Sequence, residues 1–468
     1  MTVGGACLKL VEPDPWQEVS RMAHQALDEW LEGLKPLLER AEPPTLRDLS
    51  AEFMRTRGTL LGACLEALAT QLHGHYQDQL KADCPGCGKC LNRKRVDPKT
   101  TTTLHGPVTL SRPYFHCRDC QIGFHPLDEA LALAQEAHQY DIQEKFTRLS
   151  AKMPYHEAVE EFAELTGIKV SNHLGHETLN RIAEAATLET VIPTPEEIQQ
   201  RIEAAKARPE DRPVLVVACD GAHAPTRPKG PRKGKRGKGE WKEVKGFRLY
   251  LSGADQQLTQ LASWHQIQDA EAFTQDLAWV ARRIPQEQVR IALLGDGAGW
   301  LWKAMTQCFP TGRCVLDYYH CAEHLYTVAK AQFEDLLEVE QWVEAAASWL
   351  SLDQPDLVIS WLEDMKPANA HAEEEIRKLI GYLDTNRDRL GYAKRREEGL
   401  PIGSGGIESA NKYISHARLK RSRAWWLIPN GNNMLRLRCA MYNGTYARVL
   451  QRYIANRHPR HSNSGTNG

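Results

Sequence analysis

Short apolar runs in the middle of the chain alternate with polar segments in a pattern that predicts buried strands. The four runs are VLVVACD from Val214, FRLYLSG from Phe247, RIALLGD from Arg290 and RCVLDYY from Arg313. Continuous apolar runs of this kind are typical of strands that are buried on both faces of a sheet. We therefore expect an α/β core whose first part spans residues 211–324.

Apolar residues at helical spacing precede this core. Residues 1–80 are predicted to form a helical N-terminal domain, which the Pro43-Pro44 pair divides into two stretches. A second helical region spans residues 135–190 and is interrupted at Gly167. Helix, glycine-containing turn and helix is the order found in helix-turn-helix DNA-binding regions, although a plain helical hairpin has the same pattern.

A helical insertion separates the two parts of the core. It covers residues 325–396, and its expected core residues are Leu325, Leu336, Trp342, Trp349, Trp361 and Leu379. Residues 397–455 are expected to complete the core and to end in basic helices. The tail at 456–468 has the composition of a disordered segment.

Length and composition indicate a soluble protein with several domains. The chain has 468 residues, which is room for about three domains. It has no apolar stretch of the roughly 18 residues that a membrane span requires, so we expect a cytoplasmic protein associated with the nucleoid. The net charge is only −1, but residues 411–468 contain eleven Lys or Arg and no Asp or Glu. This asymmetry favours one surface that binds a polyanion.

Two CxxC pairs predict a metal centre. The members of the two pairs are Cys84, Cys87, Cys117 and Cys120. Four thiolates are the ligand set of a tetrahedral structural Zn²⁺ site, and a β-rich stretch lies between the pairs, so residues 81–130 are expected to form a zinc-ribbon-like module. Cys90 and His116 lie nearby and are alternative ligands.

Three acidic residues stand in settings that favour divalent cations. Asp220 and Asp296 each close an apolar run and precede a glycine, and Glu408 opens a helix behind the glycines of GSGGIESANK. Buried strands of α/β sheets present functional groups where they end, so the three carboxylates are expected to meet at one sheet edge. Two Mg²⁺ or Mn²⁺ ions bound there would suit phosphodiester chemistry. The simpler interpretation is that the Asp-Gly pairs are turns and that Glu408 pairs with Lys412.

Six motifs in a fixed order resemble a known family. They are CDGAHAPTR, WKEVK, LLGDGAGWLW, CVLDYYHCAEHL, GSGGIESANK and HARLKRSRAWW. In this order the chain resembles bacterial insertion-sequence transposases of the ISKra group, distant relatives of the Mutator-like transposases, over nearly its whole length. The resemblance implies a ribonuclease H-like core with an α-helical insertion, and a DDE triad of Asp220, Asp296 and Glu408. Asp317 also ends an apolar run and is an alternative second acid, but the resemblance places it and His320 in a slot of supporting residues near the site.

Basic and aromatic residues near the acidic residues are candidates for DNA contact. A lysine-rich loop, Lys229–Gly239, follows Asp220, and a second basic segment follows Glu408 on what we expect to be the same helical segment. Cations neutralise phosphates, and aromatic rings stack on unpaired bases. The candidates are Arg227, Lys242, Arg418, Lys420, Arg421, Arg423, Trp425 and Trp426. The alternative is that the loop is only a solvated charge run and that a tryptophan belongs to the core.

These patterns together predict a DNA transposase. It would bind the inverted-repeat ends of an insertion sequence, cut the DNA strands and transfer them to target DNA in a metal-dependent reaction. A homodimer or higher oligomer is expected because two element ends must be held together. Two alternatives stay open: a catalytically silent DNA-binding regulator derived from a transposase, and a ribonuclease H-like nuclease that does not join strands.

Overall fold

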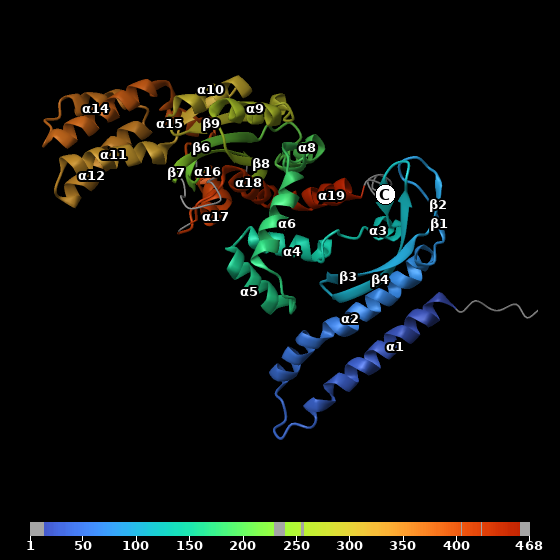
Figure 1. Ribbon diagram of the computed structural model, residues 1–468. Coiled ribbons are helices and arrows are strands. Elements are labelled where there is room, and N and C mark those ends of the chain that lie inside the picture. The colour runs from blue at the N-terminus through green and yellow to red at the C-terminus, as the bar shows by residue number, and fades with distance from the viewer. Residues whose placement is uncertain (1–13, 229–238, 254–256, 404, 423, 459–468) are drawn as a thin grey trace, which may run out of the picture. The chain divides into compact units, whose positions relative to one another are not determined.

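The computed structural model describes residues 14–228, 239–253, 257–403, 405–422 and 424–458 (Figure 1). The chain divides into two compact units, one formed by residues 1–178 with 451–468 and the other by residues 179–450. Within the described residues, no helix is both long and apolar enough to cross a membrane.

Two long helices begin the first unit, where the sequence predicted helix on both sides of a proline pair. They are α1 (Pro15–Leu34) and α2 (Leu46–Gln77), with a short 3-10 helix, η1 (Lys35–Leu37), between them. Thr45 caps α2, because its hydroxyl accepts from the backbone N–H of Asp48 while the Asp48 carboxylate accepts in return from the Thr45 backbone. This reciprocal cap fixes the start of the helix directly after the prolines.

Two small antiparallel sheets follow α2. Their strands are β1 (Lys81–Asp83), β2 (Cys90–Asn92), β3 (Arg95–Thr103), β4 (Gly106–Cys117) and β5 (Ile122–Phe124), followed by α3 (Pro126–Ala130). Strands β3, β4 and β5 pair in that order, and β1 pairs with β2. The core between α2, β4 and α3 includes Val108, Leu110 and Leu127. Gly62 permits the close approach of α2, because a Cβ there would lie 2.5 Å from the Pro107 carbonyl oxygen.

Three helices occupy the region of the predicted helix-turn-helix. They are α4 (Tyr140–Ser150), α5 (Tyr155–Thr166) and α6 (Asn172–Glu184). Gly167 ends α5 in the left-handed conformation with a φ of 76°, as the sequence break suggested. Phe146 of α4 packs on Phe162 of α5 in a small core. A DNA-binding role for these helices stays a prediction.

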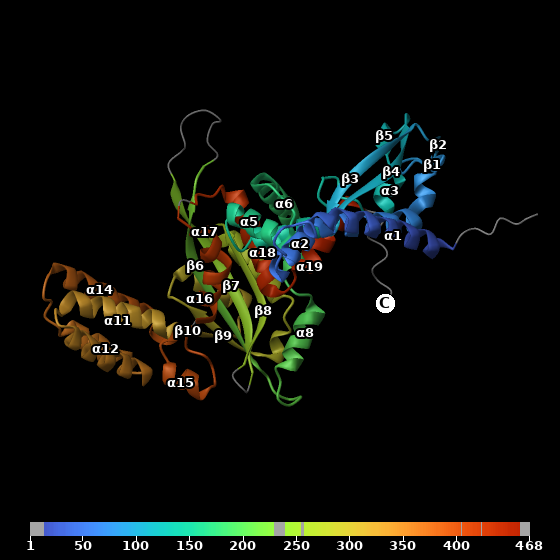
Figure 2. The same cartoon turned by 90° about the horizontal axis from the view of Figure 1, so that it is seen from below.

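A mixed five-stranded sheet forms the centre of the second unit (Figure 2). Its strands are β6 (Val214–Thr226), β7 (Glu240–Ser252), β8 (Leu258–Ile267), β9 (Arg290–Gly295) and β10 (Arg313–Leu316). The spatial order is β10-β9-β6-β7-β8, in which β6, β7 and β8 are antiparallel and β9 and β10 are parallel to β6. Four of these strands contain the predicted apolar runs, whereas β8 was not predicted from the sequence.

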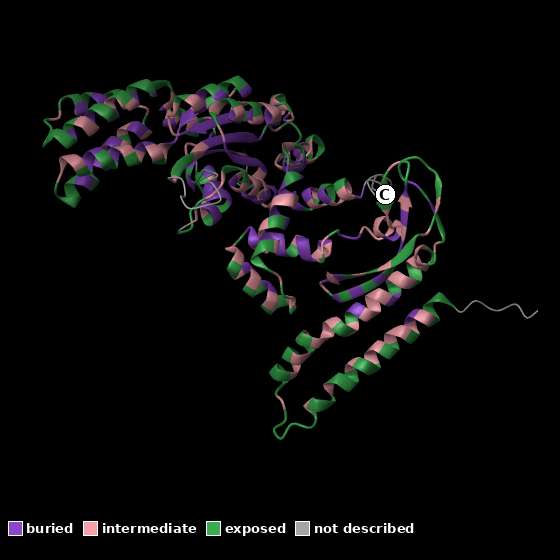
Figure 3. Ribbon diagram, viewed as in Figure 1, coloured by how far each residue is buried: buried purple, intermediate pink, exposed green. Residues whose placement is uncertain are grey.

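Helices cover both faces of this sheet, and its middle strands are buried (Figure 3). Phe247 of β7 contacts Phe273 of α9, whose neighbour α10 packs on β6 and β9, so these two helices cover one face. Arg248, which follows Phe247 and points to the other face, donates to the Gly406 carbonyl of α16. The covering helices are α9 (Ala270–Ala281), α10 (Gly299–Cys308), α16 (Gly405–Asn411) and α18 (Ile428–Asn443).

The predicted insertion between the two parts of the core is helical. Its helices are α11 (Tyr318–Gln332), α12 (Leu336–Ser351), α13 (Pro355–Glu363), α14 (Ala370–Thr385) and α15 (Tyr392–Glu397). The rings of Trp342 and Trp361 stack with their centroids 5.2 Å apart. Leu336 was wrongly predicted to be a core residue: it is 72% exposed, because it occupies the first position of α12.

Four further α-helices and a π-helix belong to the described part of the chain. They are α7 (Leu188–Val191), α8 (Pro195–Ala204), α17 (Ala417–Leu419) and α19 (Tyr446–Arg457), with a π-helix at Lys412–His416 between α16 and α17. Most of the tail that was predicted to be disordered, residues 459–468, lies outside the described residues.

Candidate acidic site and cysteine cluster

Asp220 lies within β6 and not at its end, which corrects the sequence prediction. The strand continues to Thr226, because its antiparallel pairing with β7 extends that far. Its parallel pairing with β9 stops at Ala218, however. Asp220 therefore stands where β9 no longer covers one edge of β6. A strand neighbour is missing on that side, which leaves room for other groups beside the carboxylate.

The carboxylate of Asp220 has two hydrogen-bond donors. Its Oδ1 accepts from the backbone N–H of Gly221 at 2.7 Å, and its Oδ2 accepts from the Nδ2 amide of Asn411 at 2.5 Å. Asn411 is the last residue of α16, the helix that also carries Glu408. The contact thus ties the second part of the core to the first at Asp220.

Asp296 follows the last residue of β9 and forms a turn, as the sequence pattern indicated. Its Oδ1 accepts from the backbone N–H of Ala298 at 2.9 Å, and Gly297 has a φ of +106°. The Asp296 carbonyl accepts from the Tyr382 hydroxyl of α14 at 2.9 Å. The helical insertion therefore supports the turn that presents this carboxylate.

The two aspartates lie close enough to interact electrostatically. Burial raises the pKa of Asp220 to about 6, and the negative charge of Asp296 adds to the shift. The backbone N–H of Gly221, the His320 ring and the Asn411 amide oppose it in part. A pair of carboxylates that repel each other in a half-buried position is an arrangement that a divalent cation would stabilise.

Replacing Asp220 by asparagine is expected to stabilise the metal-free protein. Because the folded-state pKa of about 6 lies above the ordinary 3.8, the ionised carboxylate weakens the fold, by up to about 3 kcal/mol above pH 6. This cost decreases as the pH falls through 6 and is absent well below 3.8. Denaturant unfolding in EDTA should therefore show a stabilised variant at pH 8 and little difference at pH 4. Equal stabilities at pH 8 would contradict the electrostatic interpretation.

Asp317 and His320 lie beside this site in distinct roles. Asp317 caps α11: its Oδ1 accepts from the backbone N–H groups of Tyr319 at 2.8 Å and His320 at 3.2 Å. It is 5% exposed, and its own N–H donates to the Gly295 carbonyl at the end of β9. Asp317 therefore fixes the start of the helix from which His320 reaches the vicinity of Asp220.

Glu408 lies on the helix that contacts Asp220, but its carboxylate faces solvent. The side chain is 65% exposed, and its Oε1 accepts from the Lys412 ammonium at 2.7 Å. Among the described residues, no three carboxylates or histidines have their ligand atoms all within 4.8 Å of one another. The structure thus brings Asp220 and Asp296 together and leaves Glu408 paired as the simpler interpretation predicted.

Sequence reasoning missed Asn411, although it lies within a quoted motif. It follows Ile407 by four residues, and both lie on the buried side of α16. That spacing from an apolar residue was the available signal, because residues four positions apart lie on the same side of a helix.

The basic segment after Glu408 is not one continuous helix, contrary to the prediction. Helix α17 ends at Leu419, and the chain then returns to the end of β6, where Trp426 donates its N–H to the Pro225 carbonyl at 3.0 Å. The Arg227 N–H donates in turn to the Trp426 carbonyl at 2.9 Å. Backbone pairing with β6 therefore positions the tryptophans.

The candidate DNA-binding residues differ in accessibility. Arg418 is 4% exposed and its guanidinium lies 5.1 Å from the centre of the Trp426 ring, so it is not available for direct phosphate contact. Trp425 is 43% exposed and lies near Trp241, which is 58% exposed. The exposed cationic candidates are Arg227, Lys242, Lys420 and Arg421. Arg423 and most of the lysine-rich loop lie outside the described residues.

The four cysteines of the two CxxC pairs form a cluster that could bind a metal such as zinc. The sulfur atoms of Cys84, Cys87, Cys117 and Cys120 all lie within 4.8 Å of one another. The first pair lies in the turn between β1 and β2, and the second lies at the turn from β4 to β5. Cys90 and His116 do not belong to this group.

Local backbone geometry shapes the cluster. The N–H of Gly86 donates to the Cys84 sulfur at 3.4 Å, and a Cβ at Gly86 would lie 3.2 Å from the Cys120 sulfur. Burial opposes ionisation of Cys84, but hydrogen bonds from the Gly86 and Cys87 N–H groups and from the Cys117 and Cys87 thiols together lower its pKa to about 7. Lys89 and Asp119 form an ion pair of 2.9 Å that joins the two turns. Thiolates are the form in which cysteine binds zinc.

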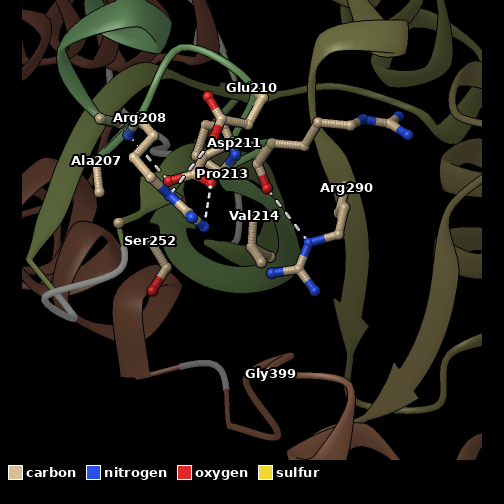
Figure 4. A pocket seen from close by; sticks show the side chains of 12 residues that line it. Ala207, Arg208, Glu210, Asp211, Pro213, Val214, Ser252, Arg290 and Gly399 are labelled. Atoms are coloured by element: carbon tan, nitrogen blue, oxygen red, sulfur yellow. Dashed lines mark hydrogen bonds and ion pairs between the residues drawn. The ribbon is translucent and has the colours of Figure 1, made fainter.

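A cavity of about 640 Å³ lies at the other end of β6 (Figure 4). Val214, the first residue of the strand, lines it together with Arg208, Asp211, Ser252 and Arg290. Arg208 and Asp211 are ion-paired with each other, and Arg290 donates to backbone carbonyls. None of the three acidic candidates lines this cavity, so it is separate from the acidic site.

Comparisons with known proteins match most of the chain. A model of UPF0236, described as an uncharacterised protein family, matches residues 58–453. A relative from Streptococcus gallolyticus, named UPF0236 protein in vanSb 3'region, is 24% identical over 440 residues. The alignment covers 88% of this chain and 86% of the relative. Neither description states an activity, a ligand or a partner.

Proposed function

The chain belongs to the UPF0236 family of uncharacterised proteins, and we propose that it is a DNA transposase with a ribonuclease H-like core. The observation that carries the proposal is the approach of Asp220 and Asp296 at the edge where β9 leaves β6. Supporting this, the helix that carries Glu408 contacts Asp220 through Asn411. The mixed sheet also supports the proposal, because it provides an α/β core in which β6 pairs with an antiparallel strand on one side and a parallel strand on the other.

The residues at this edge fit one or more divalent cations. Asp220 and Asp296 offer carboxylate oxygens, the ligands that Mg²⁺ and Mn²⁺ prefer, and burial together with the Asp296 charge raises the pKa of Asp220. Glu408 would join them by giving up its contact with Lys412. Such cations supply activation of an attacking hydroxyl and neutralise charge on the phosphate.

Several residues of the chain would hold the reacting groups in position. The Gly221 N–H and the Asn411 amide fix the Asp220 carboxylate, and the Tyr382 hydroxyl holds the Asp296 backbone. His320, on the helix capped by Asp317, lies beside Asp220 and would stabilise negative charge or carry a proton. The proposed substrate is the double-stranded DNA of an element end and its target. The cysteine cluster would hold structural Zn²⁺, and helices α5 and α6 would contribute to end recognition.

DNA would approach the acidic site along Trp425 and its neighbours. We expect Trp425→Ala to weaken binding of DNA with an unpaired strand by about 5-fold to 150-fold, because stacking of a base on an aromatic ring is worth roughly 1–3 kcal/mol. Fluorescence anisotropy with a forked oligonucleotide measures this. Tyr326→Ala, which removes a ring of similar exposure from α11, is the control. Equal losses in both variants would remove Trp425 from the interface.

The proposal is tested with the wild-type protein and the DNA that flanks its own gene. Short inverted repeats and a target duplication around the gene are the expected finding. Duplex oligonucleotides that carry these repeats should then be nicked in Mg²⁺ or Mn²⁺, and the freed 3′ ends should be joined to a supercoiled target. Cleavage without joined products would favour a nuclease that does not transpose.

The pairing of Glu408 with Lys412 favours a second candidate, a regulator that binds DNA without cutting it. In this case the third carboxylate would never join the other two. Tight and specific binding of the repeat ends, with no cleavage in either metal, would support this alternative. Cleavage that depends on Glu408 would exclude it.

A further inference from the structure

We propose that Asn411 is a positioning residue of the acidic site and that the buried His265 ring holds its side-chain amide in the required orientation. The proposal deepens the proposed function, because orienting Asp220 has a purpose only if that carboxylate binds a metal. Neither residue was singled out by the sequence motifs, and each belongs to an element that covers or forms the central sheet.

The sheet places Asp220 and His265 on the same face with a glycine between them. Asp220 of β6 is opposite Gly246 of β7, and Gly246 is opposite His265 of β8. Residues directly opposite each other in antiparallel strands point to the same face. A Cβ at Gly246 would lie 2.2 Å from the Nδ1 atom of His265, so the ring occupies the space over this glycine. A glycine is therefore required for the ring to lean toward Asp220.

Asn411 interacts with both flanking residues. Its Nδ2 donates to Asp220 at 2.5 Å. It also acts on the His265 ring, whose pKa burial lowers to about 3 while Asn411 opposes that effect. The side chain of Asn411 is thus the link between the carboxylate on β6 and the imidazole on β8.

The hydrogen-bonding groups of Asn411 and His265 are buried and incompletely paired. Asn411 is 2% exposed and His265 is fully buried. Among the described residues, the Oδ1 atom of Asn411 and both ring nitrogens of His265 have no hydrogen-bond partner. Buried polar atoms without partners are costly, and they concentrate at functional sites. A small adjustment that lets one ring N–H donate to Oδ1 would satisfy both residues.

This bond would determine which way the amide points. A neutral imidazole has one donor and one acceptor, whereas an amide presents a donor on one side and an acceptor on the other. If His265 donates to Oδ1, the Nδ2 group must face Asp220. The reverse orientation would place Oδ1 against the carboxylate and repel it. The carboxylate is then held in one rotamer by a neutral donor, which leaves its charge for a cation.

The backbone after Asn411 is consistent with a specialised position. The chain changes from α-helix to π-helix at Lys412–His416, directly after this residue. Such π segments are rare and occur frequently at functional sites. The wider turn lets α16 end with the Asn411 side chain directed at the sheet.

The experiment compares Mn²⁺ affinity, followed by electron paramagnetic resonance, in the full chain and its variants. Asn411→Ala and His265→Leu should each weaken binding about 10-fold to 100-fold, as expected for groups that orient a ligand. His265→Gln keeps an N–H donor and should restore affinity to within a few-fold of wild type. The double variant should bind no more weakly than Asn411→Ala alone, because both changes remove one interaction.

A second measurement does not involve the metal. In the metal-free protein with ¹⁵N-labelled histidine, His265 should appear as a neutral ring in a single tautomer, and Asn411→Ala should shift that signal. The control is Asn443→Ala, which removes another buried amide that hydrogen-bonds the Ser263 backbone of β8. This variant should lower stability but leave Mn²⁺ affinity unchanged.

Wild-type affinity in Asn411→Ala, or equal losses in His265→Leu and His265→Gln, would overturn the inference. So would the absence of Mn²⁺ binding that is sensitive to Asp220→Ala in the wild-type chain. If the predicted affinities are found but the wild-type protein cuts no DNA, the inference stands and the proposed function fails.

Discussion

Asp296→Asn is expected to abolish metal-dependent cleavage while DNA binding persists. Asparagine has the same shape, and its Oδ1 can still accept from the Ala298 N–H, so the turn after β9 is retained. The variant loses the negative charge that a cation at the edge of β6 requires. We expect the cleavage rate to fall on the order of 10³-fold or more, as for the loss of a catalytic group that acts together with others. Gel-based cleavage of repeat-end duplexes and a binding titration on the same DNA measure the two properties separately.

The matched control is Asp276→Asn. Asp276 is a half-buried aspartate of α9 whose pKa is raised by burial, and its carboxylate accepts from the Trp264 indole at 2.8 Å. It lies outside the acidic site, so its replacement should leave the cleavage rate within a few-fold of wild type. Cleavage retained in Asp296→Asn would remove this residue from the mechanism. Cleavage retained in Glu408→Gln would show that the pair with Lys412 is the only role of Glu408.

The sequence predicted most strands of the second unit because buried strands are continuous apolar runs. The runs at Val214, Phe247, Arg290 and Arg313 all became strands. Strand β8 escaped prediction because its sequence, LTQLASWHQI, mixes polar and apolar residues. Ser263 and Gln266 are nonetheless buried, since the Ser263 backbone bonds to Asn443 and the Gln266 side chain bonds to the Asn432 carbonyl. Such tertiary partners cannot be inferred from local spacing.

The sequence also misjudged where β6 ends. Asp220-Gly221 has the composition of a turn, but pairing with β7 extends the strand through it. A Cβ at Gly221 would lie 2.2 Å from the Glu243 carboxylate, so the glycine serves a close side-chain approach and not a turn. At Asp296 the same dipeptide does form a turn, with Gly297 at positive φ. The difference depends on the neighbouring strand, which no single-sequence pattern reveals.

The candidate site was predictable only in part for the same reason. The two aspartates were identified by their strands, and the structure places them near each other. The orientation of Glu408 depends on which face of α16 packs on the sheet, and Ile407, Ala410 and Asn411 take that face. The roles of Asn411 and His265 depend on strand register, which brings residues 220, 246 and 265 into one row.

Removing metal from the cysteine cluster is expected to unfold the part of the first unit that carries it. Strands β1, β2 and β5 have three residues each, and β1 and β2 form a sheet of only two strands. Short strands of this kind are not stable alone. A structural Zn²⁺ contributes about 10 kcal/mol or more of binding free energy at neutral pH, which would stabilise the folded turns. Chelation should therefore make residues 81–130 sensitive to protease and to hydrogen exchange.

Cys117→Ser tests the same point by mutation. Cys117 is fully buried at the end of β4, where serine would replace a ligand by a hydroxyl that zinc binds poorly. The zinc content, measured by metal analysis, should fall from one ion per chain toward none. Hydrogen exchange should show at the same time that residues 81–130 lose protection. Cys90→Ser is the control, because Cys90 is exposed and lies outside the cluster. Loss of zinc in Cys90→Ser, or full zinc occupancy in Cys117→Ser, would show that the ligand set differs from the four clustered thiols.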